Sequence, residues 1–144
     1  MVGEAPGEQE DLQGRPFIGR AGKILDDLLP RAGLERALVF ITSLVKCRPP
    51  KNRDPRPEEL EACAPHLNRQ LELLRPQLIV PLGRFAMARW LPGHKISEVH
   101  GQVFRVEGLR VIPLYHPGAA LHQPRYREPM IRDMASLAAE LGNS

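Results

Sequence analysis

The spacing of apolar residues predicts several amphipathic helices along this chain. Apolar side chains recur at intervals of three and four over residues 21–29, 60–74, 86–90 and 130–141, as expected for helices that bury one face. The longest pattern follows Pro57-Glu58-Glu59, where a proline in the first turn and acidic residues beside it favour the start of a helix.

Short apolar runs of strand length separate these helical patterns. Residues 38–42 and 78–80 are continuous runs, typical of strands in a parallel sheet that is buried on both faces. Residues 103–106 and 109–114 flank Glu107-Gly108, which predicts a hairpin-like turn. Met1-Val2 resembles the end of a buried strand, most of which is absent. The alternation predicts a three-layer α/β/α fold with a central, mainly parallel, four-stranded sheet.

Three unusual loops follow the expected strands. They cover residues 3–19, 43–57 and 116–124, and the segment 8–14 within the first is expected to be a polar loop. Ligands of open α/β sheets bind beyond the carboxyl ends of the strands, so these loops should meet at one edge of the sheet. The acidic residues crowded into the first loop argue against a glycine-rich phosphate cradle there.

Composition narrows the class of protein. A net charge of +3 and a pI near 9.2 fit nucleic-acid binding, although a scattered charged surface fits them equally well. No apolar run approaches the ~20 residues of a membrane helix, and no signal peptide is recognisable, so we expect a cytoplasmic protein without membrane contact. The two cysteines, Cys47 and Cys63, are too few for a disulfide scaffold or a closed four-ligand metal site.

Several motifs together resemble those of one enzyme family. They are Gly3-Glu4-Ala5-Pro6-Gly7, Gly14-Arg15-Pro16-Phe17, Val45-Lys46-Cys47-Arg48-Pro49-Pro50 and Tyr115-His116-Pro117. On these residues the chain resembles the iron–sulfur (type-4) branch of the uracil-DNA glycosylase superfamily over nearly its whole length. The resemblance implies a DNA repair hydrolase that flips uracil out of DNA and hydrolyses its N-glycosidic bond, leaving an abasic site. We expect one domain over residues 1–144, lacking an N-terminal segment with the family's first cysteine pair.

The resemblance also implies roles for individual residues. His116 would stabilise the departing uracil anion, and Glu4 and Glu10 would orient water or stabilise charge on the sugar. The residues expected to surround the uracil are Ala5, Phe17, Ser43 and His116. Phe17, His116 and the two acids also have simpler interpretations: Phe17 as a core residue, His116 as an ordinary loop histidine, and the acids as surface carboxylates.

A second group of residues is expected to contact DNA. In the family a small-apolar loop enters the duplex as the base leaves, and Gly118, Ala119 and Leu121 match it, with Leu121 at the tip. Arg125 and Arg127 follow and could contact phosphates. An ordinary apolar loop is an equally good interpretation of any one of these residues.

The chain departs from the family pattern at several positions. A [4Fe–4S] cluster needs four thiolates, and Cys47 and Cys63 match only two of the ligands, so the cluster is expected to be absent or incomplete. Ser43 replaces the asparagine that reads the uracil edge, which leaves base specificity open. His100 stands where the family usually has arginine. Ala120 and His122 replace leucine and arginine, which predicts weaker insertion and weaker phosphate contact.

Three hypotheses therefore remain. The chain is an active uracil-DNA glycosylase, a member of the superfamily that binds DNA or damaged bases without cutting, or a truncated gene product. A generic nucleotide-binding domain ranks last because no GxGxxG or P-loop pattern occurs. The expected partner is uracil-containing DNA, with no obligate protein partner.

Overall fold

The strands of the protein lie side by side in one layer. The computed structural model describes residues 1–142, so the last two residues of the expected domain, 143 and 144, lie outside the described part. The strands are β1 (Val2–Gly3), β2 (Thr42–Ser43), β3 (Leu78–Ile79), β4 (Phe104–Val106) and β5 (Leu109–Val111). They are short, and backbone hydrogen bonds beyond their ends join them into one array.

The order of the strands is β2-β1-β3-β5-β4. Strand β1 pairs in parallel with β2, and β3 pairs in parallel with β5. The amide of Val2 donates to the Val80 carbonyl at 3.0 Å, and the amide of Leu82 donates to the Val2 carbonyl at 2.8 Å, which joins β1 to β3. Strand β4 is antiparallel to β5 at the edge. The prediction of a mainly parallel sheet is confirmed, and so is the hairpin around Glu107-Gly108. Within residues 1–142 the four parallel strands are joined by β4 as a fifth, so the predicted number of four strands was one too low.

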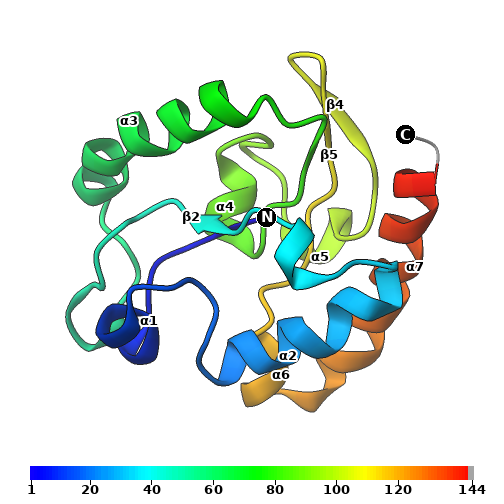
Figure 1. Ribbon diagram of the computed structural model, residues 1–144, viewed down its shortest axis with the longest axis horizontal. Coiled ribbons are helices and arrows are strands. Elements are labelled where there is room, and N and C mark those ends of the chain that lie inside the picture. The colour runs from blue at the N-terminus through cyan, green and yellow to red at the C-terminus, as the bar shows by residue number, and fades with distance from the viewer. Residues whose placement is uncertain (143–144) are drawn as a thin grey trace.

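Helices cover both faces of the sheet because neighbouring strand residues point in opposite directions. Val80 and Ile112 pack against the cluster formed by α2 (Arg20–Leu28) and α7 (Arg127–Gly142). Ile79 and Val111 pack against the cluster formed by α3 (Pro57–Leu74), α4 (Arg84–Ala88) and α5 (Ile96–Val99). Figure 1 shows α3 on one side of the strands and α2 with α7 on the other. The predicted α/β/α layers are thus confirmed.

Three sequence predictions of local structure were wrong. Residues 8–14 are not a loop, because helix α1 (Glu8–Gln13) occupies most of them. The strand expected over residues 38–42 is confined to β2, since Leu38 ends a 3-10 turn, η2 (Arg36–Leu38), and is 80% exposed. The expected loop after Gly118 is a short helix, α6 (Ala119–His122). In each of these segments the apolar residues follow no periodicity that distinguishes a helix or a strand from a loop.

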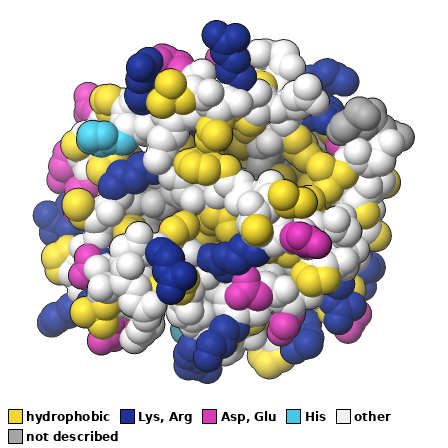
Figure 2. All heavy atoms as spheres, in the orientation of Figure 1, with side chains coloured by type: hydrophobic (Ala, Val, Ile, Leu, Met, Phe, Trp, Pro, Cys, Tyr) yellow, Lys and Arg dark blue, Asp and Glu magenta, His cyan; other side chains and the backbone are white. Residues whose placement is uncertain are grey.

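Several apolar residues that lie outside the sheet line an apolar groove. It has a volume of about 290 Å³, and its walls include Met1, Leu38, Phe40, Leu74 and Leu141. Figure 2 shows hydrophobic side chains gathered around this hollow. Several of the residues that line the groove come just before strands in the sequence, so the groove lies near the amino ends of the strands.

No helix within residues 1–142 is long and apolar enough to cross a membrane.

Candidate active site at the carboxyl edge of the sheet

The loops that follow β1, β2, β3 and β5 meet at the carboxyl edge of the sheet. Gly3 is in register with Ser43, and the pairing continues as the Val45 amide donates to the Glu4 carbonyl at 3.0 Å. Gly83, after β3, lies against His116, because a Cβ at Gly83 would be 3.0 Å from the His116 Cβ. The sequence predicted this convergence, which places the first and second loops beside the His116 segment.

Phe17 forms a wall of this site. Its backbone has a left-handed φ of 50°, a strained value for an aromatic residue. Its ring covers Gly3 so closely that a Cβ there would lie 2.5 Å from the Phe17 Cε2 atom. The ring centroid lies 5.5 Å from that of His116. Phe17 is only 9% exposed and belongs to the core, so it has both the burial of a core residue and a place beside the histidine.

His116 is held as a neutral imidazole. The Gly118 amide donates to the His116 Nδ1 atom at 2.9 Å, and a ring nitrogen that accepts a hydrogen bond carries no proton. Burial lowers the pKa of His116 to about 4, because the charged form loses its hydration. The proton of the neutral ring is therefore on Nε2, which is left to act as a donor.

The two acidic residues of the first loop have different surroundings. Glu4 is half-buried, and burial raises the pKa of its carboxyl; Asp54 raises it further and Arg84 opposes the rise. Arg84 itself pairs with Asp54 at 3.1 Å. A carboxyl with a raised pKa is a better proton acceptor than an ordinary surface carboxylate.

Glu10, by contrast, is tied to the backbone. One carboxylate oxygen accepts from the Gly7 amide at 3.4 Å and the other from the Gly19 amide at 3.1 Å. A Cβ at Gly7 or Gly19 would lie 3.2 or 3.1 Å from these oxygens. The carboxylate thus joins the start of α1 to the start of α2, an arrangement that the sequence analysis missed. Gly7 and Gly19, which directly precede α1 and α2, were the available signal.

Ser43 is fixed by its neighbours in the second loop. Its hydroxyl donates to the Val45 carbonyl at 2.7 Å. Its carbonyl accepts from the Lys46 Nζ atom at 2.7 Å, and the same ammonium donates to Thr42 Oγ1 at 2.6 Å and Gln70 Oε1 at 2.9 Å. Burial lowers the pKa of Lys46. Sequence reasoning did not single out this lysine, although a cation between Val45 and Cys47 interrupts an apolar run.

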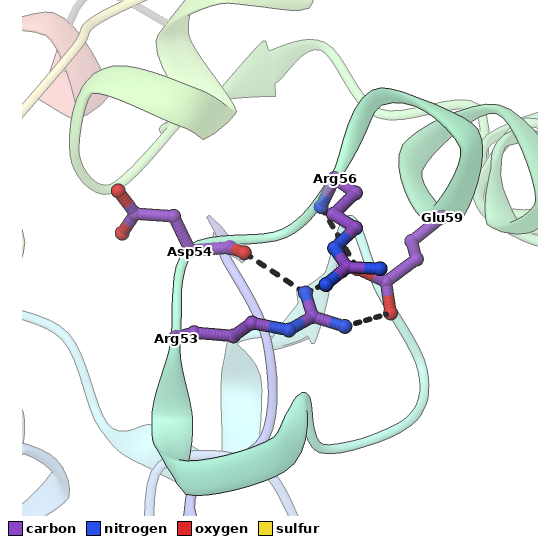
Figure 3. Close-up of polar contacts among 4 residues, drawn as sticks. All are labelled: Arg53, Asp54, Arg56 and Glu59. Atoms are coloured by element: carbon purple, nitrogen blue, oxygen red, sulfur yellow. Dashed lines mark hydrogen bonds and ion pairs between the residues drawn. The ribbon is translucent and has the colours of Figure 1, made fainter.

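Charge-assisted hydrogen bonds hold the rest of the second loop (Figure 3). Arg53 donates to the two carboxylate oxygens of Glu59 at 2.6 and 3.1 Å and to the Asp54 carbonyl at 3.1 Å. The Arg56 amide donates to Glu59 at 2.8 Å, which caps α3. The Arg53 hydrogen bond, followed by that of Arg56, lowers the pKa of Glu59 to about 2. The loop that carries Cys47 is therefore anchored to the start of α3.

The cysteines do not complete a metal site by themselves. Cys47 is exposed in the second loop, and Cys63 is half-buried on α3. Among residues 1–142, no group of three or more His, Cys, Asp or Glu side chains is arranged to hold a metal ion. A [4Fe–4S] cubane needs four thiolates, and the sequence contains two cysteines. These residues thus do not fit a whole cluster.

Of the predicted DNA-contact residues, Gly118 lies directly against His116. Ala119 and Leu121 are on α6 and half-buried, and Ala119 packs against the core. Arg125 and Arg127 are exposed at η4 (Pro124–Tyr126) and the start of α7. Ala5, the remaining residue of the expected uracil pocket, is half-buried and packs against the cluster under α3.

Comparisons with known proteins agree with this geometry. The sequence model of the uracil DNA glycosylase superfamily matches residues 1–136. The chain belongs to this superfamily. A type-4 uracil-DNA glycosylase of Archaeoglobus fulgidus is 48% identical over an alignment that covers 99% of the chain and 76% of the relative.

Further relatives of the superfamily are similarly close. A type-4 uracil-DNA glycosylase of Sulfurisphaera tokodaii is 43% identical, with 95% of the chain and 67% of the relative covered. One from Saccharolobus solfataricus is 42% identical, with 99% and 71% covered. The resemblance inferred from the motifs is therefore confirmed at the level of the family.

Proposed function

We propose that this chain removes uracil from DNA by hydrolysing the N-glycosidic bond, which leaves an abasic site and free uracil. Membership of the superfamily supports this activity, and relatives at 42–48% identity are named uracil-DNA glycosylases. The single observation that carries the mechanism is the hydrogen bond from the Gly118 amide to His116 Nδ1.

His116 acts on the leaving group. As the bond between uracil N1 and the sugar C1′ breaks, its electron pair stays on the base, and negative charge develops on the uracil oxygens. The Nε2–H of neutral His116 donates a hydrogen bond to that charge, which lowers the barrier because the donor is already oriented. The Gly118 amide keeps the proton on Nε2, so the histidine needs no change of tautomer during the reaction.

Glu4 acts on the water. Positive charge develops on the sugar as the base departs, and the Glu4 carboxylate stabilises it from the first loop. The water oxygen then bonds to C1′, and its proton passes to the Glu4 carboxylate, whose raised pKa favours that transfer. No step passes through an iron–sulfur cluster.

The remaining loop residues position the base. Phe17 stacks on the flipped uracil ring, and Ser43 and Ala5 line its edge. Glu10 keeps the first loop closed through the Gly7 and Gly19 amides, so its role is to position rather than to react. Gly118, Ala119 and Leu121 contact the duplex at the gap left by the base, and Arg125 and Arg127 contact phosphates.

A strand-breakage assay tests the proposal. The protein is incubated with an oligonucleotide that contains one uracil, and alkali then breaks the DNA at abasic sites; thymine and hypoxanthine oligonucleotides are controls. We expect breakage only at uracil, lost in His116→Ala and kept in His66→Ala, since His66 is an exposed residue of α3. A protein that melts cooperatively and breaks none of the strands would refute the activity.

A second candidate function is binding of damaged DNA without excision. Ser43 favours it, because its one hydroxyl already donates to the Val45 carbonyl and cannot present the donor and acceptor pair of an amide. If this function holds, wild-type protein binds uracil DNA without breaking it. Excision gained in Ser43→Asn would then identify position 43 as the missing specificity element.

A further inference from the structure

Residues 116–125 form a segment of loop and short helix, the 116–125 excursion. The two residues that flank this segment contact each other. The excursion contains His116, helix α6 and Arg125, and it begins after Tyr115 and ends before Tyr126. The rings of Tyr115 and Tyr126 lie 4.9 Å apart, centroid to centroid. Arg125 continues the stack, with its guanidinium carbon 5.1 Å from the centre of the Tyr126 ring. The excursion is therefore closed at its base by aromatic contact.

A second ring, that of His100, also lies against Tyr115 and is hydrogen-bonded to a buried acid. The His100 ring lies 4.4 Å from the Tyr115 ring, and its Nδ1 atom lies 2.8 Å from an oxygen of Asp133. Asp133, on α7, is only 6% exposed. The ring stack is thus anchored to a carboxylate in the core layer, and an imidazole so held cannot rotate freely.

Gly101 has no side chain, which allows Asp133 to approach the backbone beside His100. Its φ is +76°, and a Cβ there would lie 2.2 Å from the other Asp133 oxygen. Its amide donates to the Pro113 carbonyl at 2.8 Å, just beyond β5. The backbone of His100-Gly101 is therefore fixed to the strand that leads into Tyr115.

We propose that His100, Asp133, Tyr115 and Tyr126 form a brace that holds the 116–125 excursion ready to enter duplex DNA. The inference rests on the proposed function and adds positioning residues to it. Entering a duplex requires unstacking of bases, and a mobile excursion would also lose conformational entropy on binding. Single-stranded DNA presents no stacked duplex to open, so the brace matters mainly for double-stranded substrates.

Hydrogen exchange in the free protein tests the brace without any activity. The amides of Ala119, Ala120 and Leu121 donate to carbonyls of residues 116–118, so their exchange reports opening of the excursion. We expect exchange to be about tenfold faster in His100→Leu and Tyr126→Leu. Tyr126→Leu leaves the His100–Asp133 pair intact and so serves if His100→Leu folds poorly. Unchanged exchange in the folded Tyr126→Leu protein would overturn the brace.

The ratio of kcat/KM on double-stranded to single-stranded uracil DNA tests its consequence. We expect this ratio to fall about tenfold in both leucine variants and to recover in His100→Arg, because a guanidinium can pair with Asp133 and stack on Tyr115. His94→Leu, at an exposed histidine between α4 and α5, should leave the ratio unchanged.

The outcomes separate the inference from the function on which it rests. An equal loss on both substrates would mean a merely structural contribution and would overturn the role in duplex opening. If wild-type protein cleaves neither substrate, the proposed function and the duplex role both fail, and the exchange experiment still decides whether the brace exists.

Discussion

The neutral state of His116 makes a specific prediction about pH. Burial lowers the pKa of His116 to about 4 from an ordinary value near 6.5. That gap corresponds to roughly 3 kcal/mol in favour of the neutral ring. At pH 6 only about 1% of the rings would be protonated, and at pH 5 about 10%. In the proposed mechanism the donor to uracil is therefore the Nε2–H of the neutral ring throughout the physiological range.

Single-turnover excision rates should thus change less than about twofold between pH 6 and pH 8. A mechanism that required the charged imidazolium would instead lose about tenfold in rate for each pH unit over the same range. The assay is quenched-flow excision from a uracil oligonucleotide, with enzyme in excess, at constant ionic strength.

His116→Gln is the matched variant, because its amide can donate a hydrogen bond but does not titrate. Its rate should be lower at every pH, with the same flat profile above pH 6. Any fall that remains toward acid pH in both proteins belongs to another group, and Glu4 is the expected one, since its raised pKa brings protonation closer to neutral pH. A tenfold fall per pH unit above pH 6 in wild type, absent from His116→Gln, would refute the neutral donor.

Three further predictions concern the loops. Gly3→Ala would place a Cβ 2.5 Å from a ring atom of Phe17, and displacement of the ring by about 1 Å should lower kcat/KM roughly tenfold or more. Glu10→Ala leaves two half-buried loop amides unpaired and should lower the free energy of unfolding by about 1–3 kcal/mol in a denaturant titration. Glu59→Gln should lower the melting temperature at neutral pH, and the difference from wild type should disappear as pH falls from 4.5 toward 2. A carboxyl whose folded pKa is depressed to about 2 stabilises the fold only while it is ionised.

Two of these predictions have a control variant in the chain. Gly142→Ala, where a Cβ meets nothing within 4 Å, should change neither activity nor stability. Glu8→Ala removes an exposed acid from the same helix as Glu10 and should cost much less stability. Equal losses for Glu8→Ala and Glu10→Ala, or a Glu59→Gln difference that persists at pH 2, would contradict the assigned contacts.

Local patterns of hydrophobic residues correctly predicted the helices and strands whose apolar side chains are buried in the core. The helical period of residues 60–74 and 130–141 became α3 and α7, and the runs near Ile79 and Val111 became buried parallel strands. The run at 38–42 misled because an apolar residue does not reveal what buries it, and Leu38 and Phe40 border a groove instead of lying in the sheet. Helix α1 was missed because its residues are almost all polar and carry no apolar stripe.

The sequence by itself determined the family, the α/β layers and the edge at which the loops meet, because these depend on residue types and on periods within short segments. Only the tertiary structure decided what each side chain does there. The His116 tautomer depends on the position of one backbone amide. The function of Glu10 depends on a contact nine residues away, and the His100–Asp133 pair joins residues 33 positions apart. Such contacts are set by how the layers pack, and no local pattern of hydrophobic and polar residues encodes them.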